Sequence, residues 1–289
     1  MASFSRNTGD EARVGSLRWT AWATYERLDE LYVGSSRETD PVDETVDIFQ
    51  TSIDLEYRFH PRWSASVTAN YLDIFQRIEG SGVRRRESGI GDTVLLAHWT
   101  ALRFHGAGEP EAQPGWLEHS SLVLMFDIGT SVPTGESVSS VDSASGTPVS
   151  SLQTGTGTFN PVLGGHLRLD WGRVAAALEA STVVPFYENR YDFQAGAFQS
   201  YRMNLEVMPV SDLRLALGLA FEHRSSDRID GESIAAGGGW RYLLYPQAVA
   251  SLGGGAELFF GAQVPFHRNF DTHQLDSAVK WELGIALGF

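Results

Sequence analysis

Residues 274–289 limit the possible folds more than any other stretch, because positions 278–289 alternate strictly between apolar side chains and small or charged ones. A β-strand turns successive side chains to opposite faces, so one face here is wholly apolar and the other is small or charged. The apolar positions are Val279, Trp281, Leu283, Ile285, Leu287 and Phe289. Such a strand suits either a soluble β-sandwich or the wall of a membrane barrel.

Length and hydrophobicity favour the barrel. The chain has 289 residues, which is long for one sandwich and comfortable for a single large barrel. Only 42% of the residues are hydrophobic, and no run of about 18 apolar residues occurs, so helical membrane spans are excluded. Transmembrane strands give a much weaker signal, because only alternate residues face lipid.

Composition also limits the partners and the compartment. The formal net charge of -14 argues against a nucleic-acid partner, which would need a basic face. The absence of Cys is consistent with an oxidising compartment. Residues 1–12 are polar and contain no signal-peptide core, so we expect a mature chain whose export signal was removed or replaced by Met1. We expect this N-terminal polar segment, 1–12, to precede one barrel domain, 13–289.

Short turns and long loops alternate between the segments that show strand periodicity. The short turns lie near Pro61, Gly172, Pro209 and Gly254, and the long loops near residues 29–44, 78–88, 135–158 and 224–238. Outer-membrane barrels have this layout, with short periplasmic turns and longer external loops. We therefore predict an all-β fold, an antiparallel up-and-down transmembrane β-barrel of about twelve strands with both termini in the periplasm. Segments 90–104 and 240–252 are the hardest to phase.

Aromatic residues gather at the predicted periplasmic strand ends. They are Phe59, Trp63, Phe104, Trp116, Trp171 and Phe289. Amphipathic rings favour the interface between membrane and water, and a soluble sandwich has no reason to band its aromatic residues in this way. The band predicts the outer membrane of a Gram-negative bacterium, where membrane lipid and lipopolysaccharide surround the chain.

Charged side chains fall on the face opposite to the apolar one. In lipid they would be prohibitive, so they must line an interior that is wet or mutually paired. The candidate lumen and constriction residues are Arg18, Asp54, Glu56, Arg58, Asp92, Asp127, Arg168, Glu179, Arg202, Glu206, Arg214, Lys280 and Glu282. They fit either an ion-paired filling or a polar conduit with a charge-tuned constriction. A barrel of this size has little spare lumen, which favours the filling for most of them.

Three Val-Pro pairs lie towards the external ends of predicted strands, at Pro133, Pro185 and Pro265. Proline cannot donate to a β-ladder, so it ends a strand or opens the wall where it stands. The simpler interpretation is strand termination above the membrane. The alternative is a lateral opening through which an apolar substrate moves sideways into lipid.

Four short glycine-containing motifs indicate a family. They are Gly89-Ile90-Gly91-Asp92, Val132-Pro133-Thr134-Gly135, Gly155-Thr156-Gly157 and Leu287-Gly288-Phe289. The chain resembles, over most of its length, the outer-membrane proteins associated with meta-cleavage phenol degradation pathways. Members of that family are regarded as transporters of aromatic or other hydrophobic compounds, so the resemblance implies uptake of such compounds. Phe289 also resembles the closing aromatic residue that the outer-membrane insertion machinery reads in bacterial barrels.

A lipid hydrolase is the enzymatic alternative. His223 and Ser225 are similar to the His-x-Ser pair of outer-membrane phospholipase A, and both share the outward phase of Phe221. A serine hydrolase needs a third polar group to orient its His, and glycines 237–239 stand where the corresponding Asn would be. We therefore predict no enzyme and no catalytic residues.

Metals and cofactors are not expected either. The eight His are scattered, and the acidic stretch 29–44 is better explained as a solvated loop than as a Ca²⁺ site. The sequence predicts a passive, porin-like channel or transporter for small hydrophobic or aromatic molecules. A structural or loop-binding barrel without transport is the second alternative, and the oligomeric state stays open.

Overall fold

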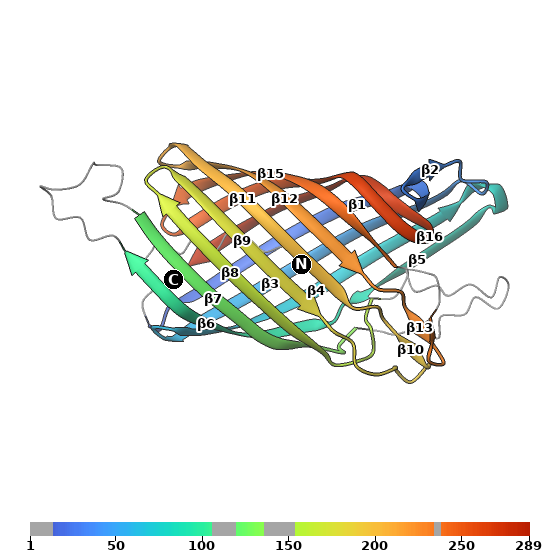
Figure 1. The fold of residues 1–289 in the computed structure, drawn as a ribbon, viewed down its shortest axis with the longest axis horizontal. Coiled ribbons are helices and arrows are strands. Elements are labelled where there is room, and N and C mark those ends of the chain that lie inside the picture. The colour runs from blue at the N-terminus through green and yellow to red at the C-terminus, as the bar shows by residue number, and fades with distance from the viewer. Residues whose placement is uncertain (1–13, 106–119, 136–153, 234–237) are drawn as a thin grey trace, which may run out of the picture.

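Figure 1 shows the computed structural model, which describes residues 14–105, 120–135, 154–233 and 238–289. Eleven strands form its ring: β1 (Leu17–Gly34), β3 (Glu44–His60), β4 (Trp63–Ile78), β6 (Thr93–His105), β7 (Ser120–Val132), β8 (Asn160–Trp171), β9 (Val174–Val183), β11 (Phe198–Val210), β12 (Leu213–Arg224), β15 (Gly239–Gly253) and β16 (Ala256–Gly288). The shorter elements are β2 (Ser36–Glu38), η1 (Glu79–Ser81), β5 (Val83–Ile90), β10 (Phe193–Gln194), β13 (Arg228–Ile229) and β14 (Glu232–Ser233).

The ring is closed and antiparallel. Each strand pairs with its neighbour in the chain, and the order runs from β1 through β3, β4 and the later strands to β16, which pairs back with β1. Closure satisfies the backbone N–H and C=O groups on both edges of every ring strand, which is what a barrel needs where water is excluded. Figure 1 shows the strands inclined to the long axis of the barrel. The predicted all-β antiparallel barrel is confirmed.

Strand β16 is unusually long, with 33 residues, because it runs through both arms of a hairpin. Residues 256–270 pair with β15, and residues 270–288 pair with β1. The two arms also touch each other. The rings of Phe260 and Trp281 stack with their centroids 5.7 Å apart, and Arg268 Nη1 lies 2.8 Å from Asp276 Oδ2.

The two faces of the wall differ as the alternation predicted. Large apolar side chains point outward around the ring and are exposed, among them Ile53, Leu167, Leu205, Leu217 and Leu283. The inward face carries the buried polar and charged side chains instead. An apolar outer belt around a polar interior is the reverse of a soluble barrel, and it suits a lipid surround. No helix within the described residues is long and apolar enough to cross a membrane.

The two ends of the barrel differ in their connections. Short turns join β3 to β4, β8 to β9, β11 to β12 and β15 to β16 at one end, called here the turn end. The opposite end, called the loop end, carries β2, β5, β10 and β13 (Figure 1). Five of the six predicted girdle aromatics, Phe59, Trp63, Phe104, Trp171 and Phe289, are exposed and border the turn end. The sixth, Trp116, lies outside the described residues.

The loop end differs from the prediction in two segments. The stretch with Arg84, Arg85 and Arg86 was expected to be a basic loop, but it forms strand β5, which pairs with β4. Strand β1 also continues to Gly34, well into the predicted acidic loop. Both segments are strongly charged, and charge hid their strand character because these side chains stand above the apolar belt, where polar groups are tolerated on both faces.

Candidate functional site

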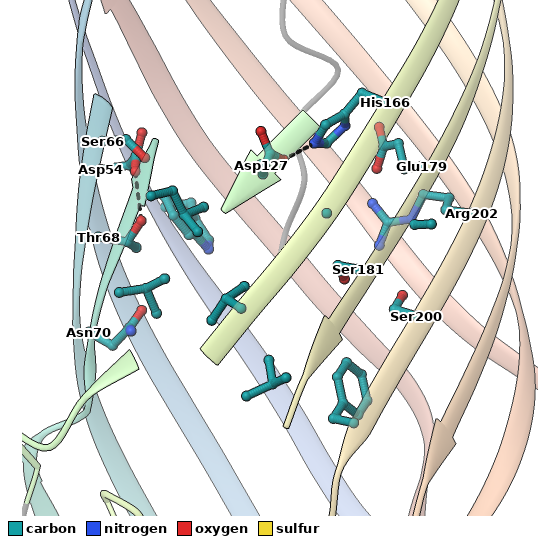
Figure 2. Close-up of a pocket in the computed structure, with 18 of the residues that line it drawn as sticks. Asp54, Ser66, Thr68, Asn70, Asp127, His166, Glu179, Ser181, Ser200 and Arg202 are labelled. Atoms are coloured by element: carbon teal, nitrogen blue, oxygen red, sulfur yellow. Dashed lines mark hydrogen bonds and ion pairs between the residues drawn. The ribbon is translucent and has the colours of Figure 1, made fainter. Parts of the chain in front are cut away.

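A cavity of about 430 Å³ lies inside the barrel. Every one of the eleven ring strands contributes to its lining, and Figure 2 shows several of these side chains pointing inward from opposite walls. The charged lining residues are Arg18, Asp54, Glu56, Asp127, Glu179, Arg202, Glu222, Arg241 and Lys280. The cavity is therefore the lumen of the barrel.

The lumen brings together most of the residues that the sequence assigned to it. Seven of the predicted residues line the cavity: Arg18, Asp54, Glu56, Asp127, Glu179, Arg202 and Lys280. Arg168, Glu206, Arg214 and Glu282 are also buried, with 2–9% of each residue exposed, but they pack against the wall beside the cavity. Glu282 accepts a hydrogen bond of 2.6 Å from the hydroxyl of Tyr245.

Arg58 and Asp92 do not line the cavity. Arg58 lies at the β3–β4 turn, where its Nη1 donates to the carbonyl oxygen of Pro61 at 3.3 Å. Asp92 lies in the two-residue break between β5 and β6 and ties loop segments together. Both side chains are at the margins of the barrel, where strand alternation no longer decides which way a side chain points.

Ion pairs fill the lumen near the turn end. Arg168 donates two parallel bonds to the carboxylate of Glu206, at 2.9 Å and 3.0 Å, and its Nη2 lies 2.7 Å from Asp170 Oδ1. Arg214 approaches Glu206 at 3.7 Å and Glu257 at 3.4 Å. We call Arg168, Asp170, Glu206, Arg214 and Glu257 the turn-end network. Bidentate pairs between arginine and a carboxylate are among the strongest polar contacts in proteins.

A second set of ion pairs lies nearer the loop end. Arg241 contacts Glu222 and Asp276, each at 2.8 Å, and reaches Glu26 at 3.7 Å. Lys280 lies 3.6 Å from the same Glu26. Sequence analysis missed Arg241 because the alternation of 240–252 is poorly phased. It missed Asp276 because the hairpin within β16 hides where the final strand begins.

Hydroxyl and amide groups cover the wall formed by β3 and β4. Thr68 donates to Asp54 at 2.6 Å, a contact drawn in Figure 2. Ser64 donates to Glu56 at 2.5 Å. These bonds satisfy one oxygen of each carboxylate, and both carboxylates still line the cavity. This wall is therefore acidic and rich in hydrogen-bonding groups.

Asp127 lies between two imidazole rings. Its Oδ1 is 2.6 Å from Nδ1 of His98, and its Oδ2 is 2.5 Å from Nε2 of His166. The other ring nitrogen of His98, Nε2, is 2.9 Å from the hydroxyl oxygen of Ser66. His98 is 2% exposed, whereas Ser66 and Asp127 both face the cavity. The sequence gave no signal for this chain of contacts, because its members come from four strands.

Apolar side chains form a row, interrupted at Gly129, across part of the lumen. In the ladder, Leu96 lies opposite Gly129, Gly129 opposite Val162, Val162 opposite Val183, and Val183 opposite Phe198. Leu96, Val162, Val183 and Phe198 all line the cavity. We call these four the apolar arc. It gives the lumen a surface on which an apolar molecule can lie without displacing ion pairs.

Three of the glycine motifs meet at one place on the loop end. The carboxylate of Asp92 accepts hydrogen bonds from the amide of Gly135 at 3.2 Å and from the amide of Thr156 at 2.8 Å. A side chain at Gly155 would bring its Cβ 2.6 Å from the Cα of Gly135 and 2.5 Å from Oδ1 of Asp92. Glycine is required here because the two chain segments touch through their backbones.

The three prolines have different surroundings. Pro133 directly follows β7, and Pro185 lies two residues beyond the end of β9. Pro265 lies within β16 at a bulge, where Leu243 pairs with Pro265 and Tyr242 pairs with His267. Beside Pro133, β5 continues the line of β6 but pairs only with β4 among the described strands. Among the described strands, the wall therefore has no ladder pairing between β5 and the end of β7.

The candidate serine of a lipid hydrolase, Ser225, is bonded to the backbone of a neighbouring segment. The hydroxyl of Ser225 accepts a hydrogen bond from the amide of Ala197 at 2.8 Å, and no contact joins it to His223 within the described residues. Within the same residues, no cluster of His, Asp and Glu is arranged to hold a metal ion.

A closed antiparallel barrel, an apolar outer belt and a charged lumen together define the class of fold found in outer-membrane β-barrels. Neither a known family model nor a curated protein matches the chain.

One of three similar solved structures supports the fold. The COG4313 outer membrane channel from Pseudomonas putida F1 matches with a TM-score of 0.71 and 14% identity, over 98% of this chain and 99% of that one. The β-domain of the Bordetella autotransporter BrkA matches with a TM-score of 0.48 and 11% identity, over 95% and 100%. The Pseudomonas putida toluene transporter TodX matches with a TM-score of 0.40 and 7% identity, over 95% and 89%.

Proposed function

We propose that the protein is a channel in the outer membrane of a Gram-negative bacterium, for passive uptake of small hydrophobic or aromatic molecules. The observation that carries this proposal is the lumen itself, a cavity of about 430 Å³ that holds the apolar arc inside an otherwise charged interior. The fold match to an outer membrane channel, and the motif resemblance to proteins of phenol degradation, agree with it. This function requires neither catalysis nor a cofactor.

The charges of the lumen have two roles in this proposal. The turn-end network fills and stiffens the narrow part of the barrel, as the sequence favoured. Asp54, Glu56, Asp127, Glu179, Arg202 and Lys280 line the open part and set which ions pass. A wall that carries both signs discourages small ions of either sign more than it discourages a neutral molecule, because only the ions lose hydration when they enter.

A sideways exit into lipid is most easily placed where β5 and the end of β7 have no ladder pairing among the described strands. Pro133 ends β7 beside β5, whose second edge has no ladder within the described residues. The hydroxyls of Thr93 and Thr134 bridge this place at 2.9 Å. An apolar solute that leaves here enters the membrane directly and avoids the turn-end network. Pro185 and Pro265 mark two further weak points, at a strand end and at a bulge.

Several other features follow from the same proposal. The barrel has twelve membrane passes, with the two arms of β16 counted separately, and its turn end faces the periplasm. Residues 13–289 form the one barrel domain behind the polar segment 1–12. Phe289, which exchanges hydrogen bonds of 2.9 Å and 3.2 Å with Leu17, contributes to recognition by the insertion machinery. Lipid and lipopolysaccharide cover the outer belt.

The decisive experiment combines two measurements on the refolded protein. Conductance is measured in planar bilayers, and uptake of a small aromatic solute is measured in liposomes. The variant Phe198→Asp places a charge on the apolar arc, so we expect aromatic uptake to fall while conductance persists. The matched control is Leu258→Asn on the outer belt, which leaves the lumen unchanged.

A disulfide tests the exit. In Thr93→Cys/Thr134→Cys, oxidation should tie the start of β6, which follows β5 in the chain, to the segment after β7. We expect this to stop aromatic uptake and leave conductance unchanged, and reduction should restore uptake. Uptake that continues unchanged in the oxidised protein excludes this exit. Absence of both conductance and uptake excludes transport and leaves a structural or loop-binding barrel.

A further inference from the structure

We propose that Ser66 is an activated nucleophile, which accepts an acyl or phosphoryl group from small uncharged esters that enter the lumen. The proposal goes beyond transport and concerns the contacts of Ser66 with His98 and Asp127. These residues come from three strands, β4, β6 and β7, and lie in one chain of hydrogen bonds. It differs from the His223 and Ser225 alternative in strand, face and partners.

The contacts define the protonation of His98. An ionised Asp127 only accepts hydrogen bonds, so the 2.6 Å contact places a proton on Nδ1 of His98. Nε2 is then the acceptor in the 2.9 Å contact with the hydroxyl of Ser66. Oδ2 of Asp127 is held by His166, which fixes the carboxylate. A serine, a base and an orienting carboxylate in this order form the arrangement of serine hydrolases.

Access to these groups is one-sided. Ser66 lines the cavity with 7% of the residue exposed, whereas His98 is 2% exposed and is not part of the lining. A molecule in the lumen therefore meets the serine hydroxyl and not its base. The same placement keeps water away from the contact between His98 and Asp127, which strengthens it.

The surroundings of Ser66 select the substrate. Leu96, the first residue of the apolar arc, lies opposite Ser66 in the ladder, so an apolar group finds a surface next to the hydroxyl. On its other side Ser66 lies opposite Glu56, and Asp54 is one step further along the same wall. These carboxylates repel anions. The site therefore suits neutral esters with an apolar acyl or aryl group that fit about 430 Å³.

The reaction step is acyl transfer. Ser66 Oγ forms a bond to the carbonyl carbon, its proton moves to His98 Nε2, and the alcohol leaves with that proton when the ester C–O bond breaks. Water then attacks the acyl carbon and passes a proton to His98 Nε2. The bond to Ser66 Oγ breaks, Oγ regains the proton, and the acid is released. Backbone amides around Ser66 take part in the ladder, so charge on the carbonyl oxygen must be met by side chains. Arg18 lines the cavity and lies opposite Glu56, which itself lies opposite Ser66, so Arg18 is the cation on the same row of the ladder as Ser66. We therefore expect reaction with activated esters and not with amides.

The test uses a fluorophosphonate probe on the full refolded chain, with intact mass and peptide mapping as readouts. Phosphorylation forms the bond from Oγ to phosphorus and releases fluoride. We expect one adduct per chain, on Ser66. Asp127→Asn and His98→Gln should lower the labelling rate roughly 100-fold, the usual contribution of a general base. Ser64→Ala is the matched control, because Ser64 lies on the same strand and face but donates to Glu56, and its labelling should equal that of the wild type.

No adduct on Ser66, equal labelling of Ser64 and Ser66, or labelling that is unchanged in both Asp127→Asn and His98→Gln overturns the proposal. Variants are compared only where heat-modified gel migration shows a folded barrel.

Discussion

Arg168 and Glu206 share two parallel hydrogen bonds, of 2.9 Å and 3.0 Å, across the inside of the barrel between β8 and β11. Both are buried, Arg168 with 8% and Glu206 with 2% of the residue exposed. The two strands are not neighbours in the ring, because β9 lies between them. The pair therefore bridges the inner surface over an intervening strand, and it holds the curvature of the wall near the turn end.

Removal of one partner should be costly. In Arg168→Leu the carboxylate of Glu206 keeps its burial but loses its main cation, so we expect a loss of about 3–5 kcal/mol in unfolding free energy. Denaturant titration of the protein in lipid vesicles measures it. Arg173→Leu, at the exposed β8–β9 turn, should change little. The double variant Arg168→Leu/Glu206→Leu should recover most of the loss, and a double variant as unstable as the single one would contradict this explanation.

Glu179 should influence ion selectivity. It lines the cavity, and in the ladder it lies between His166 on β8 and Arg202 on β11. Glu179→Lys replaces a negative charge by a positive one inside the path, so the ratio of cation to anion permeability should fall several-fold. The reversal potential in a salt gradient measures this ratio. Asp29→Lys makes the same change on the outer side of β1 and should leave it unchanged. An identical reversal potential in Glu179→Lys would place the ion path elsewhere.

A charged side chain on the outer belt should destabilise the barrel. Leu217 is 54% exposed near the middle of β12 and points away from the lumen. Leu217→Arg should cost about 2–4 kcal/mol of stability if the side chain lies near the bilayer midplane. Unfolding in vesicles measures the cost. Ser211→Arg, in the short β11–β12 turn, adds the same side chain outside the belt and should cost little. Equal stability of both variants would mean that lipid does not cover this surface.

Strand alternation predicted most of the wall. Where apolar and polar residues alternate without interruption, as in β12 and the end of β16, the sequence determines which side chains face inward. Arg214 and Glu282 were placed on the inner face for this reason, and both are buried there. The prediction failed where charge occurs on both faces, as in β5, because alternation carries no information above the apolar belt.

Side-chain contacts between different strands could not be predicted from the sequence. Ser66 and His98 are 32 residues apart, and His98 and Asp127 are 29 apart. Their meeting depends on the register of β4, β6 and β7, which one sequence does not define. His98 also lies in the segment where Val94, Leu95 and Leu96 blur the phase, so it was not singled out as a lumen residue. A register signal from paired positions would have been needed to find it.

Asp92 should control the order of the loop end. Its carboxylate accepts bonds from the amide of Thr156 at 2.8 Å and from the hydroxyl of Thr156 at 2.7 Å, and it also accepts a bond from the amide of Gly135. In Asp92→Ala these donors lose a charged acceptor, which is worth about 1.5–3 kcal/mol per bond. The Thr156 amide should therefore exchange its hydrogen at least about tenfold faster, as measured by mass spectrometry.

Transport should respond in the same variant. If the solute leaves beside Pro133, loosening this contact should raise aromatic uptake in liposomes without changing conductance, because the lumen lining is untouched. Asp73→Ala is the matched control: Asp73 forms an equally short pair with Arg86, at 2.6 Å, but on an exposed part of β4 and β5. Faster hydrogen exchange at Thr156 with unchanged uptake would mean that order at the loop end does not limit transport. The Asp92 contact would then not control the exit of the solute.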